Sequence, residues 1–252
     1  MKIIKWGFIG CGEVTEKKSG PAFSEVEGSS VVAVMSRDER HARSYAERHG
    51  IPRWYTDAQE LIDDPDVNAV YIATPPSSHA TFAIMAMKAG KPVYVEKPLA
   101  STYEDCTRIN RISAETGQPC FVAYYRRYLP YFNKVREIVQ RGVIGKVVNV
   151  QVRFAVPPRE LDYTKPEELP WRLQPDIAGG GYFYDLAPTS WICCSTCSVS
   201  SLRPVAFVPI VVDSIRLRTP SVLASSSRMG CPARVRGALW PTSLPAKTVS
   251  IW

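Results

Sequence analysis

Residues 3–12 read IIKWGFIGCG, a short and largely apolar run that ends in glycines. Such a run is typical of a buried parallel strand, and glycines directly after a first strand favour a tight turn into a helix. Gly10 permits the turn, whereas Gly12 lets the backbone approach a pyrophosphate at the helix N-terminus. The third glycine of the usual pattern is replaced by Thr15. The stretch therefore predicts a turn that binds a dinucleotide.

The alternation of short apolar runs with helical segments continues to about residue 123. Further strands are expected at 31–35, 68–74, 92–95 and 120–123, and helices at 38–48, 77–87, 103–115 and about 131–141. Strands separated by helices of roughly 10–15 residues indicate βαβ units and a doubly wound parallel sheet. Asp38 and either Ser77 or Ser78 are the expected N-caps, and Gly50 the expected C-terminal stop. A period-2 pattern at 145–154 predicts a half-exposed sheet in a second domain.

The composition is that of a folded protein with an unusual last quarter. The chain has 252 residues, 45% hydrophobic, with a net charge of +7 from 31 Lys and Arg against 24 Asp and Glu. Residues 189–252 contain seven of these basic residues and one acid, so residues 1–188 are nearly neutral. This distribution argues against a nucleic-acid binder. Without a membrane-length apolar run or a signal-peptide pattern, a soluble, cytoplasmic protein is expected.

The end of the second expected strand bears on the choice of cofactor. It reads Met35-Ser36-Arg37-Asp38. An acidic residue at this place would bind the ribose 2′-OH of NAD, whereas Arg37 beside the small hydroxyl of Ser36 fits a 2′-phosphate better. We therefore expect NADP, with NAD as the alternative. In the plainer interpretation, Arg37 is a solvated residue at the start of a helix and Asp38 is only its cap.

The third long strand ends in Thr74-Pro75-Pro76-Ser77-Ser78-His79. Two prolines keep the chain extended, so that a nicotinamide or a ribose could lie against it. His79 is either a group that binds the cofactor or a structural residue in the first turn of its helix. No Cys or second His stands at metal-ligand spacing from His79, and no metal site is expected.

Three later stretches carry charged groups at places where function is expected. In Glu96-Lys97-Pro98, a lysine follows a buried parallel strand and could exchange a proton with a substrate, although a solvated loop lysine has the same pattern. Residues 124–128 read YYRRY, an aromatic and cationic cluster suited to a polyhydroxylated or anionic substrate. Residues 179–185 read GGGYFYD, which by itself is a flexible turn before a helix.

Taken in order, these stretches resemble the glucose–fructose oxidoreductase/inositol dehydrogenase family (Gfo/Idh/MocA type). The segments that carry the resemblance are GFIGCGEVTE, AVMSRD, YIATPPSSH, VYVEKP, AYYRR, PWR and GGGYFYDLAP, which cover essentially all of 1–188. The resemblance implies a Rossmann domain at 1–123 and the start of an open-faced α/β sheet domain at 124–188. It also implies NAD(P)-dependent oxidation of a sugar or polyol hydroxyl, or the reverse reduction, and a homo-oligomer is possible in full-length members.

The resemblance also assigns roles to individual residues. It implies that Lys97 helps to bind the cofactor and to orient or protonate the reacting oxygen, and that Asp185 contacts the substrate, so these two are the catalytic candidates. The expected substrate-binding residues are Arg126 and Asp185. The expected cofactor-binding residues are Gly10, Gly12, Glu13, Val14, Ser36, Arg37, Thr74, Pro75, His79, Glu96, Lys97 and Arg172.

After residue 188 the sequence departs from the family. The family motif has a histidine four residues after the Asp, but Thr189 stands there and no histidine follows. The remaining text is rich in Ser, Arg, Pro and Cys and shows no helix or strand periodicity. If the DNA is read in a shifted frame, with the last base of each codon joined to the first two bases of the next, permitted codons can encode the missing His and Asp at the family's spacing from Asp185. The forced junctions agree: Trp191–Ile192 must give Asp, and Cys193–Cys194 must give Leu.

We therefore expect 189–252 to be an out-of-frame, poorly ordered tail. A chain that lacks this histidine is expected to bind cofactor weakly and to turn over slowly or not at all, and a non-catalytic dinucleotide-binding protein is the alternative. A zinc knuckle at Cys193-Cys194-x-x-Cys197 is disfavoured because no second ligand pair stands at suitable spacing.

Overall fold

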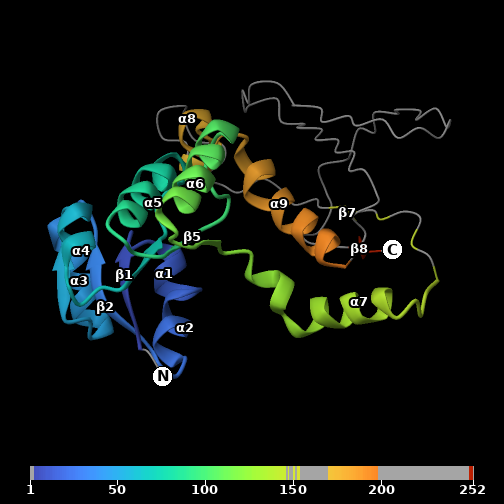
Figure 1. Cartoon of the computed structure of the whole chain (residues 1–252), viewed down its shortest axis with the longest axis horizontal. Coiled ribbons are helices and arrows are strands. Elements are labelled where there is room, and N and C mark those ends of the chain that lie inside the picture. The colour runs from blue at the N-terminus through green and yellow to red at the C-terminus, as the bar shows by residue number, and fades with distance from the viewer. Residues whose placement is uncertain are drawn as a thin grey trace, which may run out of the picture. The chain divides into compact units, whose positions relative to one another are not determined.

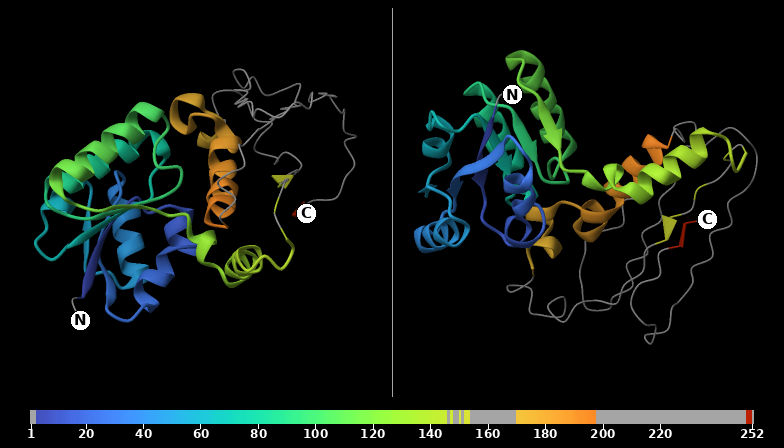
Figure 2. Two further views of the ribbon diagram at one scale, coloured as in Figure 1. Left: turned by 45° about the vertical axis from the view of Figure 1, so that its right-hand side comes forward. Right: turned by 90° about the horizontal axis from the view of Figure 1, so that it is seen from below.

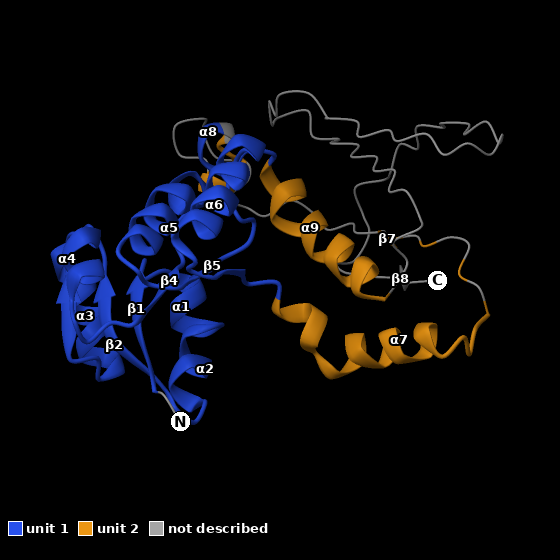
Figure 3. Ribbon diagram, in the orientation of Figure 1, with its two compact units in different colours: residues 1–124, 176–180 blue, residues 125–175, 181–252 orange. Residues whose placement is uncertain are grey.

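The computed structural model describes residues 3–145, 147, 150, 152–153, 170–197 and 250–251. The chain divides into two compact units (Figure 3). Unit 1 comprises Met1–Tyr124 with Asp176–Gly180, and unit 2 comprises Tyr125–Pro175 with Gly181–Trp252. The first unit contains the elements that the N-terminal sequence patterns predict.

Unit 1 alternates strands and helices around one sheet (Figure 1). The strands are β1 (Ile4–Ile9), β2 (Ser29–Met35), β3 (Arg53–Tyr55), β4 (Ala69–Ile72), β5 (Val93–Val95) and β6 (Cys120–Val122). The helices are α1 (Glu13–Lys17), α2 (Gly20–Glu25), α3 (Glu39–His49), α4 (Ala58–Asp63), η1 (Pro76–Ser78), α5 (His79–Lys88) and α6 (Tyr103–Thr116). The sheet order is β3-β2-β1-β4-β5-β6, and every pair is parallel. The predicted doubly wound α/β fold is confirmed.

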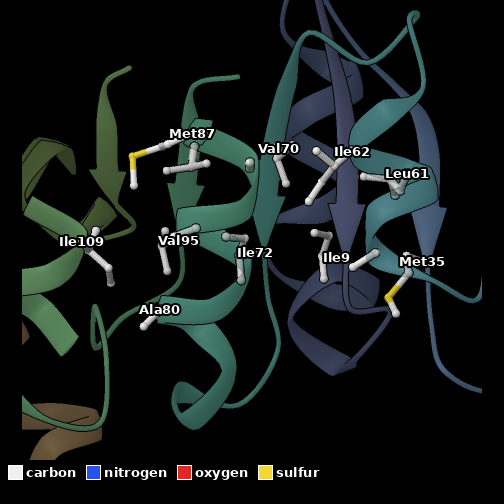
Figure 4. Packing of buried hydrophobic residues seen from close by; sticks show 14 of the residues in the cluster. Ile9, Met35, Leu61, Ile62, Val70, Ile72, Ala80, Met87, Val95 and Ile109 are labelled. Carbon is white, nitrogen blue, oxygen red and sulfur yellow. The ribbon is translucent and has the colours of Figure 1, made fainter. Parts of the chain in front are cut away.

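Side chains of the central strands alternate between two apolar layers. Ile9, Ile72 and Val95 pack with α4, α5 and α6 on one face of the sheet (Figure 4). Phe8 and Tyr71 pack with side chains of α2 and α3 on the other. Figure 2 shows helices on both faces of the sheet. Burying each large apolar side chain contributes about 1.5–3 kcal/mol. The sheet is therefore held from both sides, as its continuous apolar strands require.

Local signals at the helix ends predicted some caps fully and another only in its position. The Asp38 carboxylate accepts a hydrogen bond from the His41 N–H (3.1 Å) at the start of α3, and Gly50 ends that helix at φ +63°. Both predictions are confirmed. Ser78, one of the two predicted caps, does occupy the N-cap position of α5, but its hydroxyl donates to Thr74 Oγ1 (2.7 Å) and makes no capping bond.

The sequence analysis also missed β3, α2 and α4. β3 is only three residues long, Arg-Trp-Tyr at the edge of the sheet, which is too short for a periodic pattern to show. α2 begins at Gly20 with a proline in its first turn. Short elements such as these depend on packing against the sheet rather than on a signal of their own.

Unit 2 is built mainly of helices among its described residues. Its described elements are η2 (Tyr125–Tyr128), α7 (Pro130–Gln140), η5 (Trp171–Leu173), α9 (Gly181–Thr196) and an antiparallel pair of β7 (Val152–Arg153) with β8 (Ser250–Ile251). α8 (Pro175–Ala178) lies at the boundary between the units. Most of the strand predicted at 145–154 lies outside the described residues.

Helix α9 corrects the expectation that regular structure stops at residue 188. It continues to Thr196 with Pro188 in its interior. The apolar side chains of α9 are distributed around the helix rather than along one stripe, so no period-3.6 signal arises. An internal proline also favours a break in a sequence-based interpretation. The expectation of a poorly ordered tail falls, for residues 198–249 and 252, outside the described part of the chain.

No helix of the described chain is both long enough and apolar enough to cross a membrane.

Candidate active site

The loops that follow β1, β2, β4 and β5 all leave the same edge of the sheet, because the strands are parallel. Backbone hydrogen bonds extend the ladder just past the strand ends. The Gly10 N–H donates to the last carbonyl of β2 (3.0 Å), and the Glu96 N–H donates to the last carbonyl of β4 (2.9 Å). This edge is where open α/β sheets bind their ligands. It collects the expected residues Gly10, Ser36, Thr74 and Glu96.

The two glycines of the first turn serve different purposes. Gly10 has φ +104°, and a Cβ there would lie 3.0 Å from the Ala73 carbonyl carbon, so only glycine fits without strain. Gly12 is the N-cap of α1 in an extended conformation, and a Cβ there would meet nothing within 4 Å. The N–H groups of Glu13 and Val14 open α1, where they have no partner within the helix. The turn therefore offers donors to an anion on an open side.

Thr15 replaces the third glycine and is fully buried. Its hydroxyl donates to the Gly12 carbonyl (2.8 Å), and its own carbonyl accepts from the Tyr45 hydroxyl (2.9 Å). Close packing is achieved instead at Gly20, where a Cβ would lie 1.7 Å from the Thr15 carbonyl oxygen. The sequence analysis missed Gly20. The Gly20-Pro21 dipeptide, a strong turn signal, could have revealed it.

The end of β2 presents a cation beside a carboxylate that is already engaged. Asp38 caps α3, as described above, and the Asp38 N–H donates to Ser36 Oγ (3.4 Å). Arg37 between them is exposed. A capping carboxylate is held by the helix N-terminus rather than offered to a ribose diol. This geometry favours recognition of a 2′-phosphate by Arg37.

His79 is fully buried, and both of its ring nitrogens face backbone carbonyls. Nε2 lies 2.7 Å from the Thr74 carbonyl oxygen and Nδ1 lies 3.0 Å from that of Pro98. Burial lowers the pKa of His79, because desolvation penalises the charged ring. The geometry favours the structural interpretation over direct contact with a cofactor. Pro75, in the same loop, is extended as expected (φ −63°, ψ 150°).

Glu96, which precedes Lys97, is held by a buried tyrosine. The Tyr71 hydroxyl donates to Glu96 Oε1 (2.7 Å), and the Lys97 N–H donates to Glu96 Oε2 (3.3 Å). Burial and the nearby Glu96 charge raise the pKa of Tyr71, so its hydroxyl remains a donor. The Lys97–Pro98 peptide is cis. The sequence analysis missed Tyr71, since a tyrosine within an apolar strand looks like core.

In unit 2, two of the expected site residues lie together. Arg172 Nε is 3.6 Å from Asp185 Oδ2, and both side chains are largely buried. The Arg172 guanidinium also stacks over the Trp171 ring at 4.4 Å. Arg126 is exposed on η2, which packs against α9. Thus α9 presents Asp185 with an arginine beside it.

Among the described residues, no three His, Cys, Asp or Glu side chains are close enough together to hold a metal ion. Cys193, Cys194 and Cys197 lie on or next to α9 as free thiols, and burial raises the pKa of each.

A six-stranded doubly wound sheet with a glycine turn after β1 defines a Rossmann-type dinucleotide-binding domain. The model of an oxidoreductase family with an NAD-binding Rossmann fold matches residues 4–124, and the GFO/IDH/MocA C-terminal domain model matches residues 132–188. The chain belongs to the Gfo/Idh/MocA oxidoreductase family.

Relatives and solved structures agree with this assignment. Oxidoreductase P35 of Formosa agariphila is 43% identical over 185 residues, which cover 73% of this chain and 57% of that protein. A 3-ketoreductase from Actinomadura kijaniata, in complex with TDP-benzene and NADP, is 29% identical with a TM-score of 0.64 and covers 73% of this chain and 54% of its own. Levoglucosan dehydrogenase, in complex with NADH and levoglucosan, is 27% identical with a TM-score of 0.67. The match covers 78% of this chain and 54% of that one. The chain spans about half the length of the curated relatives it matches, 57% for the first and 53% for the next two.

Proposed function

We propose that the protein is an NADP(H)-dependent oxidoreductase that acts on a hydroxyl or carbonyl group of a sugar, polyol or related small molecule. The observation that carries the proposal is the shared sheet edge, which places an anion-accepting glycine turn and the loop of Lys97 at the same ends of two parallel strands, β1 and β5, on either side of β4. Of the similar structures named above, the levoglucosan dehydrogenase is named for a sugar derivative and the 3-ketoreductase for the reduction of a keto group.

The residues at this edge fit a nicotinamide dinucleotide. The N–H groups at the start of α1 would bind the pyrophosphate, with Gly12 leaving its side of the turn open. Arg37 would bind the 2′-phosphate, and Ser36 would lie beside it. Thr74 and Pro75 supply the extended segment against which a ribose or nicotinamide would rest. NAD remains the second cofactor candidate, because a bound NADH appears in one of the similar structures and NADP in another.

When bound, the nicotinamide exchanges a hydride with a carbon of the substrate. In the oxidation, the substrate hydroxyl must also lose its proton, and Lys97 is the residue proposed to hold this proton at the reacting oxygen. In unit 2, Asp185 is the proposed acceptor for a substrate hydroxyl. Arg172, stacked on Trp171, orients that carboxylate. Arg126 is a further proposed contact for the substrate.

Cofactor titration tests this proposal. We expect NADPH to bind with enhanced nicotinamide fluorescence and more tightly than NADH. Absence of binding by either nucleotide would refute the proposal. A panel of sugars and polyols then separates the two functions. Binding with no change in nicotinamide absorbance on any substrate favours the non-catalytic dinucleotide-binding protein. Thr189 favours the non-catalytic alternative, because a threonine hydroxyl cannot take up a proton at the position where other members of the family have a histidine.

We also propose that the coding sequence after residue 188 is translated out of frame. The forced codon junctions support this, and the C-terminal family model likewise ends its match at residue 188. DNA sequencing across codons 188–197 is expected to reveal one inserted or deleted base. A gene whose reading frame is restored is expected to give a chain with faster turnover. Equal turnover of both chains would argue against the proposal.

A further inference from the structure

Both neighbours of Lys97 in the sequence are held by buried side chains from elsewhere in unit 1. Glu96 is bonded to Tyr71 of β4, and the Pro98 carbonyl faces His79 of α5. We propose that Tyr71 and His79 are positioning residues that fix the turn at residues 96–98 and thereby hold Lys97 in place. The consequence for cofactor binding rests on the proposed function, whereas the positioning itself does not.

The hydrogen-bond direction at Tyr71 follows from the acceptor. A carboxylate has no hydrogen to give, so the Tyr71 hydroxyl must donate to Glu96. The Tyr71 oxygen is then free to accept, and Ser19 Oγ lies 2.6 Å away. Ser19 therefore donates to Tyr71 at 2.6 Å in preference to the more distant Val14 carbonyl at 3.3 Å, and Tyr71 donates to Glu96. Ser19 stands between α1 and α2, so this chain of bonds links the helix after the glycine turn to the turn that contains Lys97.

Tyr71 is well placed to act as a rigid support. Its side chain is 0% exposed, and its ring contacts those of Phe8 and Phe23 at centroid distances of 5.0 and 4.7 Å. Packing therefore fixes the ring, and the fixed ring fixes the hydroxyl. A support of this kind preorganises a reactive group because its own rotamer is locked.

His79 holds the other side of the turn. Its Nδ1 faces the Pro98 carbonyl, and its Nε2 faces the Thr74 carbonyl, so one ring bridges the loops that follow β4 and β5. Carbonyl oxygens only accept hydrogen bonds, and the neutral ring that burial favours carries one N–H, so it donates to one of the two carbonyls and packs against the other. Both loops are candidate cofactor contacts. The ring therefore sets their separation directly beneath the ligand edge.

Hydrogen exchange of the free protein tests the positioning role. Tyr71→Phe keeps the packed ring and removes the hydroxyl. We expect amide exchange in the segment 94–100 to quicken about tenfold, the factor that follows from losing a hydrogen bond to a charged group. His79→Phe, which removes the other support of the turn, is the second variant if Tyr71→Phe does not fold. His79→Phe is expected to quicken exchange in both 73–79 and 94–100.

The matched control is Tyr55→Phe. The Tyr55 hydroxyl also donates to a carboxylate, that of Asp64 (3.1 Å), which lies in an ion-pair cluster with Arg53. This variant should quicken exchange near its own site and leave 94–100 unchanged. Unchanged exchange in 94–100 after Tyr71→Phe, or after His79→Phe where the former does not fold, would overturn the inference. An equal effect of Tyr55→Phe on that segment would also overturn it.

Titration then connects positioning to binding. Tyr71→Phe should weaken NADPH binding several-fold, while adenosine 2′,5′-bisphosphate, which lacks the nicotinamide half, binds as to the unaltered chain. Equal weakening of both ligands would indicate a general structural defect and would count against the inference. If the unaltered chain binds neither ligand, the proposed function fails, and the exchange result still decides the positioning role.

Discussion

The strictest test of the turn after β1 is to add one methyl group at Gly10. The Gly10 backbone has φ +104°, and the new Cβ of Gly10→Ala would lie 3.0 Å from the Ala73 carbonyl carbon and 3.1 Å from its oxygen. A positive φ costs an alanine about 1–2 kcal/mol. Forcing backbone apart in a packed region costs about 1–3 kcal/mol more. We therefore expect the free energy of unfolding to fall by roughly 2–5 kcal/mol.

Thermal unfolding followed by circular dichroism measures this loss. For a chain of this size each kcal/mol corresponds to about 2–4 °C, so the midpoint should fall by roughly 4–20 °C. Affinity for NADPH should fall as well, because the turn that presents the α1 N–H groups is displaced. An unchanged midpoint for Gly10→Ala would show that the turn is not under the constraint that the backbone angles indicate.

Gly12→Ala is the matched control, two residues away. Its Cβ meets nothing within 4 Å, and φ is −91°, which alanine adopts readily. Alanine loses less backbone entropy on folding but is a poorer N-cap, and both effects amount to about 1 kcal/mol or less. Stability should therefore change little while NADPH binding is lost, because the methyl group occupies the open side. Retention of full affinity would remove the proposed pyrophosphate site.

Three further predictions concern single side chains. In fluorescence titrations, Arg37→Asp should change the ratio of the NADPH and NADH affinities by tenfold or more, so that NADH becomes the preferred ligand. The reason is that an arginine–phosphate pair contributes about 1.5–3 kcal/mol. An unaltered ratio of the two affinities would argue against Arg37 as the phosphate ligand. Burial raises the pKa of Cys11 to about 12, so only ~10⁻⁴ of its thiol is ionised at about pH 8. An alkylating reagent should therefore modify Cys11 only after the chain unfolds, as mass spectrometry would show. Rapid labelling of the native chain would contradict the buried position of Cys11. Burial lowers the folded-state pKa of His79, so the unfolded chain takes up the proton first as the pH falls. The free energy of unfolding should therefore be complete above about pH 6.5 and decline below it. Melting curves of His79→Phe should show a weaker decline, and an identical pH dependence would exclude His79 as the cause of the decline.

Most of unit 1 was predictable because its signals are local. Asp38 and Gly50 mark the ends of α3 through their own backbone and side-chain chemistry, and the apolar runs mark five of the six strands. β3 was not predicted, because three residues at the edge of a sheet are too few to show a hydrophobic periodicity. The part of α9 after Pro188 was not predicted, because the apolar residues of the helix surround its axis and the proline interrupts the pattern.

The candidate site was predictable to the level of loops but not of contacts. Parallel strands bring their carboxyl ends to one edge, so Gly10, Ser36, Thr74 and Glu96 could be grouped from the strand pattern alone. The support beneath them could not be deduced in this way. Tyr71 and His79 are distant in sequence from the groups they hold, Glu96 and Pro98, and a tyrosine or histidine among apolar residues gives no sign of its partner.

The amino-acid order alone determined the doubly wound class, the glycine turn and the chemical types at the ligand edge, since these follow from short-range periodicity and backbone preferences. Only the tertiary structure decided that Arg172 lies beside Asp185, and that Tyr71 and His79 contact the residues on either side of Lys97. These are contacts between groups brought together by packing, and packing is a property of the whole sheet and its helices rather than of any one segment.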